Sequence, residues 1–163
     1  MGYGLRCLVP AQAMGVFPYV FKRILIVCIG NICRSPTAEF LFRERLAHRG
    51  IHISSAGLKA LVGRPMDDNA MQILKEHGID AAEHRARQLD PTMLRDADLI
   101  LTMERNHLTA VSRVAPEASG KLFLLDKWHT ASDVPDPFRQ PRHVFEHVHA
   151  MIESGVDSWL RYL

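Results

Sequence analysis

The hydrophobic pattern begins with a short run of apolar residues. Arg23 to Ile29 (RILIVCI) is almost continuously apolar and rich in β-branched side chains. Such a run is typical of a strand that is buried on both faces, as in a parallel sheet. Three further runs are interpreted as strands, and they cover residues 51–55, 98–103 and 121–125.

Helical patterns separate these strands. A helix is expected to start at Ser35-Pro36, because a capping hydroxyl followed by proline is a helix-start signal, and to stop at Gly50. Further helices are expected over residues 67–77, 104–111 and 142–162. Strands that alternate with helices predict an α/β fold with a mainly parallel sheet.

Composition and charge exclude several classes of protein. The chain has 163 residues, of which 47% are apolar and 23% charged, so it is expected to form one globular domain. A net charge of +2 is too small to indicate a nucleic-acid partner. No apolar run approaches the roughly 20 residues of a membrane helix, so membrane insertion is not expected.

The first residues differ from the rest of the chain. Residues 1–21 are expected to be a flexible extension that precedes a domain over residues 22–163. Two prolines and an arginine interrupt their apolar pattern, whereas a signal peptide needs a continuous apolar core. Secretion is therefore rejected. Because Met14 is a second methionine, residues 1–13 are hypothesised to come from a start codon assigned too early.

Three cysteines are present, Cys7, Cys28 and Cys33. An odd count in a chain of this length is not typical of a disulfide-stapled secreted domain. The count favours a reducing cytoplasm, in which at least one thiol can be reactive.

The segment Cys28 to Pro36 (CIGNICRSP) joins the first strand to the first helix. A loop that ends at a helix N-terminus directs several backbone N–H groups into one concavity, and the helix dipole favours an anion there. Arg34 adds a planar set of donors that suits two phosphate oxygens. The segment therefore predicts an oxyanion cradle, and the residues expected to touch a bound phosphate are Ile29, Gly30, Asn31, Ile32, Cys33 and Ser35.

Cys28 enters this cradle from the strand. The positive environment that binds phosphate also stabilises a thiolate, and a thiolate below a phosphate is a nucleophile. The pattern predicts phosphoryl transfer to sulfur followed by hydrolysis, with the Ser35 hydroxyl donating to the sulfur. The alternatives are a buried strand cysteine and a nucleotide-binding loop, and the latter lacks its Gly-Lys-Ser/Thr sequence.

A cysteinyl-phosphate reaction needs a general acid for the leaving oxygen. Asp136 is the best candidate, because Pro135 and Pro137 stiffen its loop and the loop follows the last strand. Asp133 is the rival, although it lacks the rigid flanks. A simple turn is the alternative interpretation.

These motifs together resemble the low-molecular-weight protein tyrosine phosphatases. The family signature corresponds to VCIGNICRSP, and the acid loop to DPF at Asp136 to Phe138. The segments SSAG, HRARQL and DLILTME also look like family segments, in the right order. The resemblance implies a three-layer sandwich with a four-stranded parallel sheet flanked by helices. It also implies catalysis without a metal or other cofactor, and the roles given above to Cys28, Arg34 and Asp136.

The resemblance implies further site residues. Asn31, Ser35, Ser55 and His84 are expected to form a hydrogen-bond network that supports the loop, although His84 alone would be interpreted as a surface histidine. Leu58 takes the place of an aromatic residue in the wall of the substrate cleft, and Phe138 replaces the tyrosine of many Asp-Pro-Tyr loops. These two residues are therefore expected to touch the substrate.

Leu58 and its loop LKALVG look like the bacterial members that are encoded with exopolysaccharide export systems. The resemblance therefore implies a phosphotyrosine-containing protein as partner, specifically a bacterial tyrosine autokinase. A cytoplasmic monomer or weak dimer is expected.

Three other functions are weighed against this one. A cysteine-relay arsenate reductase needs a further cysteine downstream, and none follows Cys33. Phosphoarginine phosphatases typically place Thr where Ile32 stands. A phosphotyrosine-binding module without catalysis would be expected to lack the nucleophile or the acid.

Two further groups of side chains have a structural interpretation as well as a functional one. The three histidines of the last helix, His143, His147 and His149, are expected on a solvated face, because they lack the His-Glu-x-x-His pattern of a metal site. Cys33 either packs the loop or forms a reversible disulfide with Cys28 that protects the thiolate.

Overall fold

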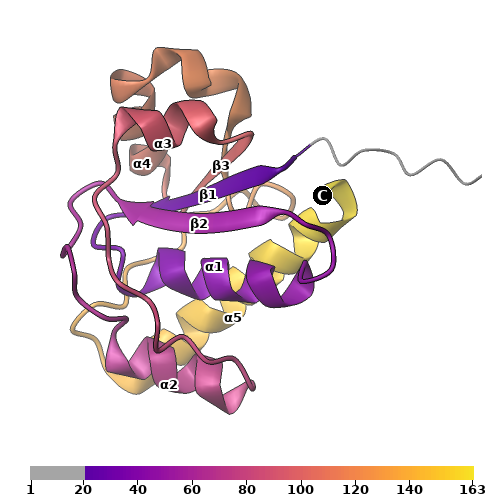
Figure 1. The fold of residues 1–163 in the computed structure, drawn as a ribbon. Coiled ribbons are helices and arrows are strands. Elements are labelled where there is room, and N and C mark those ends of the chain that lie inside the picture. Colours follow the sequence, from indigo (N-terminus) through magenta and orange to yellow (C-terminus); the bar gives the residue numbers. More distant parts are fainter. Residues whose placement is uncertain (1–20) are drawn as a thin grey trace, which may run out of the picture.

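The computed structural model describes residues 21–163. The expectations for residues 1–20, including Cys7 and the early start codon, lie outside the described residues. A four-stranded parallel sheet forms the centre, with strand order β2-β1-β3-β4 (Figure 1). The strands are β1 (Arg23–Cys28), β2 (His52–Gly57), β3 (Leu99–Thr102) and β4 (Leu122–Leu124).

Both faces of the sheet are buried, as the apolar runs predict. Along β1, Ile24, Ile26 and Cys28 belong to one hydrophobic cluster, and Leu25 and Val27 belong to another. This alternation follows from the strand period of two, which sends successive side chains to opposite faces. The position of Cys28 on the strand therefore determines the side of the sheet on which its sulfur lies.

Helices cover the two faces and complete three layers (Figure 1). Helices α1 (Arg34–Arg45), α2 (Asp68–Glu76) and α5 (Arg142–Trp159) lie on one face, and α3 (Pro91–Asp96) and α4 (Arg105–Val114) lie on the other. Two short 3₁₀ helices, η1 (Pro116–Lys121) and η2 (Leu160–Tyr162), complete the chain. The predicted fold class is confirmed.

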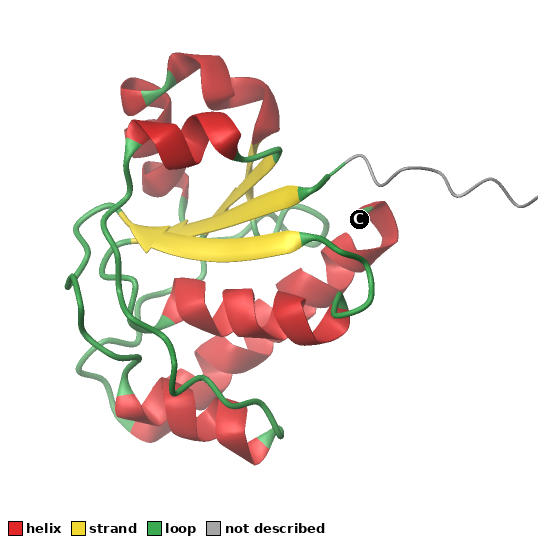
Figure 2. Cartoon of the chain, in the orientation of Figure 1, coloured by secondary structure: helices red, strands yellow, loops and turns green. Residues whose placement is uncertain are grey.

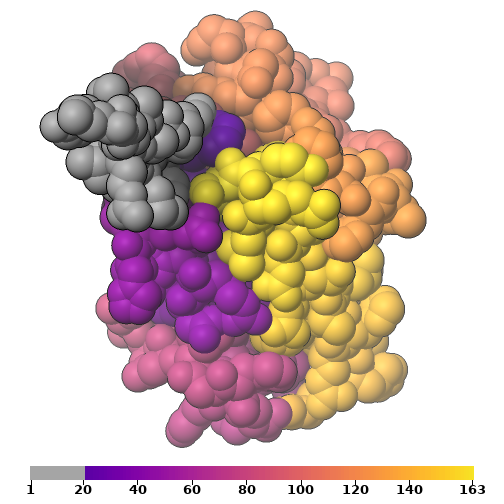
Figure 3. All heavy atoms as spheres, turned by 90° about the vertical axis from the view of Figure 1, so that its right-hand side faces the viewer, coloured from indigo at the N-terminus to yellow at the C-terminus, as the bar shows by residue number. Residues whose placement is uncertain are grey.

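Helix α5 joins the elements on its side of the sheet. It packs against both α1 and α2. In Figure 3 it forms the yellow surface beside the purple α1, with the orange segment that precedes it on its other side.

Several element boundaries differ from the prediction. Helix α1 ends at Arg45 and turns follow to Gly50, whose φ of +65° lets the chain reverse before β2. Cys33, not Ser35, is the N-cap of α1, and it provides no side-chain hydrogen bond. Strand β2 continues to Gly57, two residues beyond the predicted end.

Loops gather at the end of the sheet to which the strand arrows point (Figure 2). The backbones approach closely there, because a Cβ added to Gly57 would lie 2.4 Å from the carbonyl oxygen of Ile29. This is the edge at which open α/β sheets bind ligands. Within residues 21–163, no helix is long and apolar enough to cross a membrane.

Candidate active site

Hydrogen bonds to its backbone carbonyl groups hold the loop between β1 and α1 from outside. Six consecutive carbonyl oxygens, of residues 28–33, each accept a hydrogen bond. Their donors, in order, are the backbone N–H groups of Leu58, Lys59 and Leu61, the ring Nε2 of His84, and the backbone N–H groups of Asp67 and Thr37.

This pattern fixes the direction of the loop's N–H groups. In a trans peptide, the carbonyl of one residue and the N–H of the next point in opposite directions. The described chain has no cis peptide, so the N–H groups of residues 29–34 point away from the outer partners. They converge on the inside of the loop, where a cavity of about 150 Å³ opens. The geometry is that of an anion cradle.

Cys28 lies at the base of this cavity, 2% exposed, with its Sγ 2.8 Å from Ser35 Oγ. Asn31 Nδ2 donates to Ser35 Oγ at 2.9 Å and to Ser55 Oγ at 2.8 Å. Because Ser35 Oγ already accepts from Asn31, its own proton is free to point at the sulfur. Ser35 can therefore donate a hydrogen bond to the Cys28 sulfur.

The orientation of the Asn31 side chain is fixed by its other end. Asn31 Oδ1 accepts from the backbone N–H of Arg87 at 2.9 Å, so its nitrogen must face the two serines. Asn31 has a φ of 57°, in the left-handed region that asparagine tolerates better than most residues. Ser55 donates in turn to the buried carboxylate of Glu39.

His84 and Arg87 support the loop from the neighbouring segment. His84 is 7% exposed rather than a surface residue, and its Nε2 donates to the carbonyl of Asn31 at 2.7 Å. The Arg87 side chain is exposed, but its Nε donates to the Ser55 carbonyl at 2.7 Å. The structure therefore brings together all four residues for which the resemblance implies a network.

Arg34 is 2% exposed and is held by two groups far away in the sequence. Its Nη1 donates to Glu104 Oε1 and, at 2.8 Å, to the carbonyl of Val134. Its Nη2 lies 3.2 Å from Asp136 Oδ2. One edge of the guanidinium is thus anchored, while the other reaches the cavity that Arg34 and Asp136 both line.

Asp136 lies at the mouth of the cavity with its side chain 47% exposed. Its Oδ1 accepts from the backbone N–H of Phe138 at 3.1 Å, which orients the carboxylate within the Pro-rich loop. The rival Asp133 instead accepts from the backbone N–H of Arg105 at 2.8 Å, at the start of α4. It does not line the cavity.

The rim of the cavity corrects one prediction. Leu58 does not line the cavity but packs against the hydrophobic cluster beneath α3 and α4. Lys59 and Leu61 line it instead, together with Ile32 and Phe138. The side chain after Ser-Ala-Gly turns inward because β2 continues to Gly57, which delays the loop that builds the wall.

Cys33 is buried, and both Cys28 and Cys33 are free thiols. Burial raises the pKa of the Cys33 thiol far above its ordinary value, and the nearby Asp67 carboxylate raises it further. Cys33 is therefore protonated under ordinary conditions, in contrast to a reactive cysteine.

The sequence interpretation missed some site residues. Glu104, which pairs with Arg34, ends the segment DLILTME two residues after β3, at the same sheet edge as Cys28. Its position after a strand at this edge was the sequence signal that could have identified it as a site residue. Lys59 and Leu61 gave no comparable signal. The expectation of a solvated face on α5 is correct for His143 and His147 and wrong for His149, which is 6% exposed.

Comparison with known proteins gives a consistent family. The model of the family "Low molecular weight phosphotyrosine protein phosphatase" matches residues 23–163. A probable low molecular weight protein-tyrosine-phosphatase, AmsI of Erwinia amylovora, is 44% identical over 88% of this chain and 99% of its own length. The low molecular weight protein-tyrosine-phosphatase Wzb of Salmonella typhimurium is 41% identical over 88% and 95% of the two chains.

A solved structure shows the same fold. Vibrio vulnificus Wzb in complex with benzylphosphonate has a TM-score of 0.84 and 39% sequence identity to this chain. The match covers 88% of this chain and 99% of that one.

Proposed function

Because the chain belongs to the low molecular weight phosphotyrosine protein phosphatase family, and is a protein-tyrosine-phosphatase, we propose that Cys28, Arg34 and Asp136 carry out its reaction. Cys28 is the nucleophile, Arg34 the phosphate clamp, and Asp136 the general acid and base. The observation that carries this proposal is the Cys28 sulfur at the base of a loop whose N–H groups converge above it.

In the first step, the Cys28 thiolate attacks phosphorus and forms an S–P bond. The bond between phosphorus and the tyrosine oxygen breaks, and the Asp136 carboxylic acid gives its proton to that oxygen. The loop N–H groups and Arg34 hold the three remaining phosphate oxygens as their charge develops. The bonds from Glu104 and Val134 keep the guanidinium in place before substrate arrives.

In the second step, the Asp136 carboxylate takes a proton from water, and the water oxygen attacks phosphorus. The S–P bond breaks and Cys28 leaves as a thiolate, which the Ser35 hydroxyl stabilises by the 2.8 Å contact. The sum of both steps is phosphotyrosine and water to tyrosine and phosphate. No metal or redox partner enters this balance.

The rim supports an aromatic substrate. Ile32, Leu61 and Phe138 line the cavity and offer apolar surface to a phenyl ring. The Vibrio vulnificus relative was solved with benzylphosphonate, in which one methylene group joins a phenyl ring to a tetrahedral phosphorus. A phosphoarginine substrate would bring a charged, planar guanidinium to this apolar rim, so the rim favours phosphotyrosine.

The physiological partner belongs to the same proposal. We infer that the phosphatase acts on a phosphotyrosine-containing protein, as its protein-tyrosine-phosphatase relatives do by name, and that this protein is the tyrosine autokinase of an exopolysaccharide export system that the resemblance of the LKALVG loop implies. We propose that the enzyme works in the cytoplasm, because a reducing compartment keeps the Cys28 thiol free.

The test of the reaction measures phosphate release from three peptides of one sequence, carrying phosphotyrosine, phosphoserine or phosphoarginine. Phosphotyrosine should be hydrolysed with a kcat/KM at least about 100-fold above the other two, because only its ring fills the rim. Preferred hydrolysis of phosphoarginine would contradict the proposal. The partner is tested separately by trapping proteins from native lysate on the Asp136→Ala variant and identifying them, with Asp133→Ala as control.

A further inference from the structure

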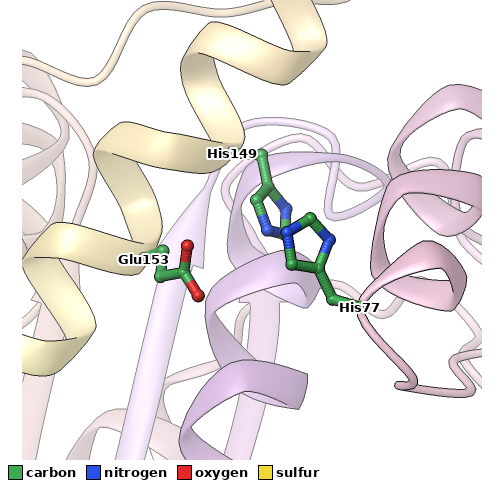
Figure 4. A group of neighbouring side chains, drawn as sticks. All are labelled: His77, His149 and Glu153. Atoms are coloured by element: carbon green, nitrogen blue, oxygen red, sulfur yellow. The ribbon is translucent and has the colours of Figure 1, made fainter.

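Three potential metal ligands meet where the end of α2 packs against α5. His77 is the C-cap of α2, and His149 and Glu153 lie one turn apart on α5. One ligand atom from each lies within 4.8 Å of the others. Figure 4 shows the two imidazole rings side by side, with the Glu153 carboxylate on the same side of α5.

His149 is the most unusual member of this group. The residue is only 6% exposed, and among the described residues neither of its buried ring nitrogens has a hydrogen-bond partner. Buried polar groups in proteins are nearly always paired, so a ring without a partner indicates a ligand that completes it. The ring faces His77 at a centroid distance of 4.6 Å and an interplanar angle of 31°.

His77 has the orientation of a metal ligand. Its Nδ1 lies 2.8 Å from the carbonyl oxygen of Ile73, which can only accept, so Nδ1 carries the proton. The lone pair is therefore on Nε2. A ring N–H that donates to a backbone carbonyl is the outer contact that fixes the tautomer of metal-binding histidines.

Glu153 supplies an anionic oxygen. The residue is half-buried, and its Oε1 accepts from Arg45 Nη2 at 2.9 Å. This contact orients the carboxylate and leaves Oε2 for another partner. Arg45 also binds Glu44 and Asp157. Its charge is therefore shared among three carboxylates and does not neutralise Glu153 alone.

We propose that His77, His149 and Glu153 bind a Zn²⁺ ion, with water as the fourth ligand. Two imidazoles and one carboxylate are a donor set that zinc takes in tetrahedral sites. Bonds of 2.0–2.2 Å place neighbouring ligand atoms about 3.4 Å apart, so the group must contract from its 4.8 Å span. The exposed His77 and the flexible Glu153 side chain permit that movement.

The site lies close to the phosphate loop. The lining of a small gap behind the phosphate loop includes His149, Cys33 and Arg34. The ion would therefore tie α2 to α5 directly behind the loop, without touching Cys28.

The test uses isothermal titration of Zn²⁺ into chelator-treated full-length protein carrying Cys28→Ser, because a thiolate would itself bind zinc. One equivalent should bind. His77→Gln should weaken binding by more than about tenfold, since even outer-shell partners contribute 10- to 100-fold to metal affinity. Glutamine keeps a donor for Ile73 at this exposed cap, so the variant should fold.

A matched control separates this site from surface chelation. His143 and His147 are exposed and four residues apart on the same helix, so they could hold zinc by themselves. The double variant His143→Ala/His147→Ala should bind zinc with unchanged affinity. Loss of binding there, or unchanged binding in His77→Gln, would overturn the proposal, as would the absence of any binding.

Two measurements identify the ligands directly. Long-range ¹H–¹⁵N spectra should show the ring nitrogens of His77 and His149 shifting on addition of one equivalent of Zn²⁺, while those of His143 and His147 stay unchanged. Zinc should also raise the unfolding temperature of the parent protein but not of His77→Gln. Neither readout depends on phosphatase activity, so the outcome is independent of the proposed function.

Discussion

Two clusters of buried polar groups lie on the same side of the sheet and differ in how they are satisfied. Around the phosphate loop, the Asn31 side chain uses both donors and its acceptor, and six consecutive carbonyls have partners. At the α2–α5 junction, the His149 ring has no partner among the described residues. The polar groups of the first cluster are paired before a ligand arrives, and its loop N–H groups are left for the ligand. The second is completed by its ligand.

The largest expected effect comes from removing the nucleophile of the first cluster. Cys28→Ser should lower phosphate release from a phosphotyrosine peptide by about 10⁴-fold or more, because removal of a catalytic nucleophile alone has effects of that size. The variant should still bind the peptide, since the N–H groups of the loop are unchanged. Near-normal turnover would mean that the sulfur does not form the intermediate.

The next effect tests the proton donor. Asp136→Asn should slow hydrolysis of phosphotyrosine by about 10²- to 10³-fold, because general acid catalysis contributes that much. The loss should be clearly smaller for p-nitrophenyl phosphate, whose leaving group needs less help from a proton. Asp133→Asn is the matched control, because Asp133 binds the start of α4 and does not line the cavity. Equal losses for both substrates would argue against Asp136 as the acid.

A third variant leaves a buried polar group around the phosphate loop without a hydrogen-bond partner, as at the α2–α5 junction. Asn31→Ala removes the hydrogen bonds to Ser35 and Ser55 and leaves the Arg87 N–H without its acceptor. The free energy of unfolding should fall by about 2 kcal/mol or more, since each buried group left unpaired costs about 1–3 kcal/mol. Urea denaturation measures this change. Asn106→Ala, on the exposed side of α4, should alter stability by less than about 0.5 kcal/mol.

The smallest effect concerns the second cluster and depends on pH. The pKa of His149 is lowered from its ordinary value of 6.5, mainly by burial and then by His77, against the opposing charge of Glu153. Below pH 6.5 the unfolded chain therefore binds a proton that the folded chain does not, so stability should fall as the pH drops. His149→Leu removes this contribution and should change stability at pH 8 by only about 1 kcal/mol.

Urea denaturation at pH 8 and pH 5.5, in the presence of a metal chelator, compares the two proteins. Burial also lowers the pKa of His107, but this contributes equally to both and cancels in the difference. Parallel losses of stability in the wild-type protein and the variant would show that His149 does not set the pH response.

The fold could be predicted because its signals are local. The run RILIVCI and the Ser-Pro step fixed the positions of β1 and α1, and the parallel sheet followed from the alternation of elements. Helix α3 and the 3₁₀ helix η1, each six residues long, were missed because they are too short to show a helical period.

The site was predictable only in its central loop and acid. The pair of Arg34 with Glu104 joins residues 70 positions apart, and His84 reaches Asn31 across 53 positions. No periodicity encodes such contacts, and His84 was placed in the network by family resemblance alone. Leu58 was misplaced because a shift of the strand end by two residues changes which side chain reaches the rim.

The outward-facing carbonyls also bear on how this enzyme can diverge. Backbone groups and Arg34 hold the anion, so the side chains of Ile29 and Ile32 are not needed for that task. Mutations there can alter which phosphorylated molecule is accepted without dismantling the chemistry below. Substrate preference and reactivity can thus evolve along separate routes in one small domain. An inhibitor that distinguishes such enzymes must therefore contact the side chains at the rim of the cavity.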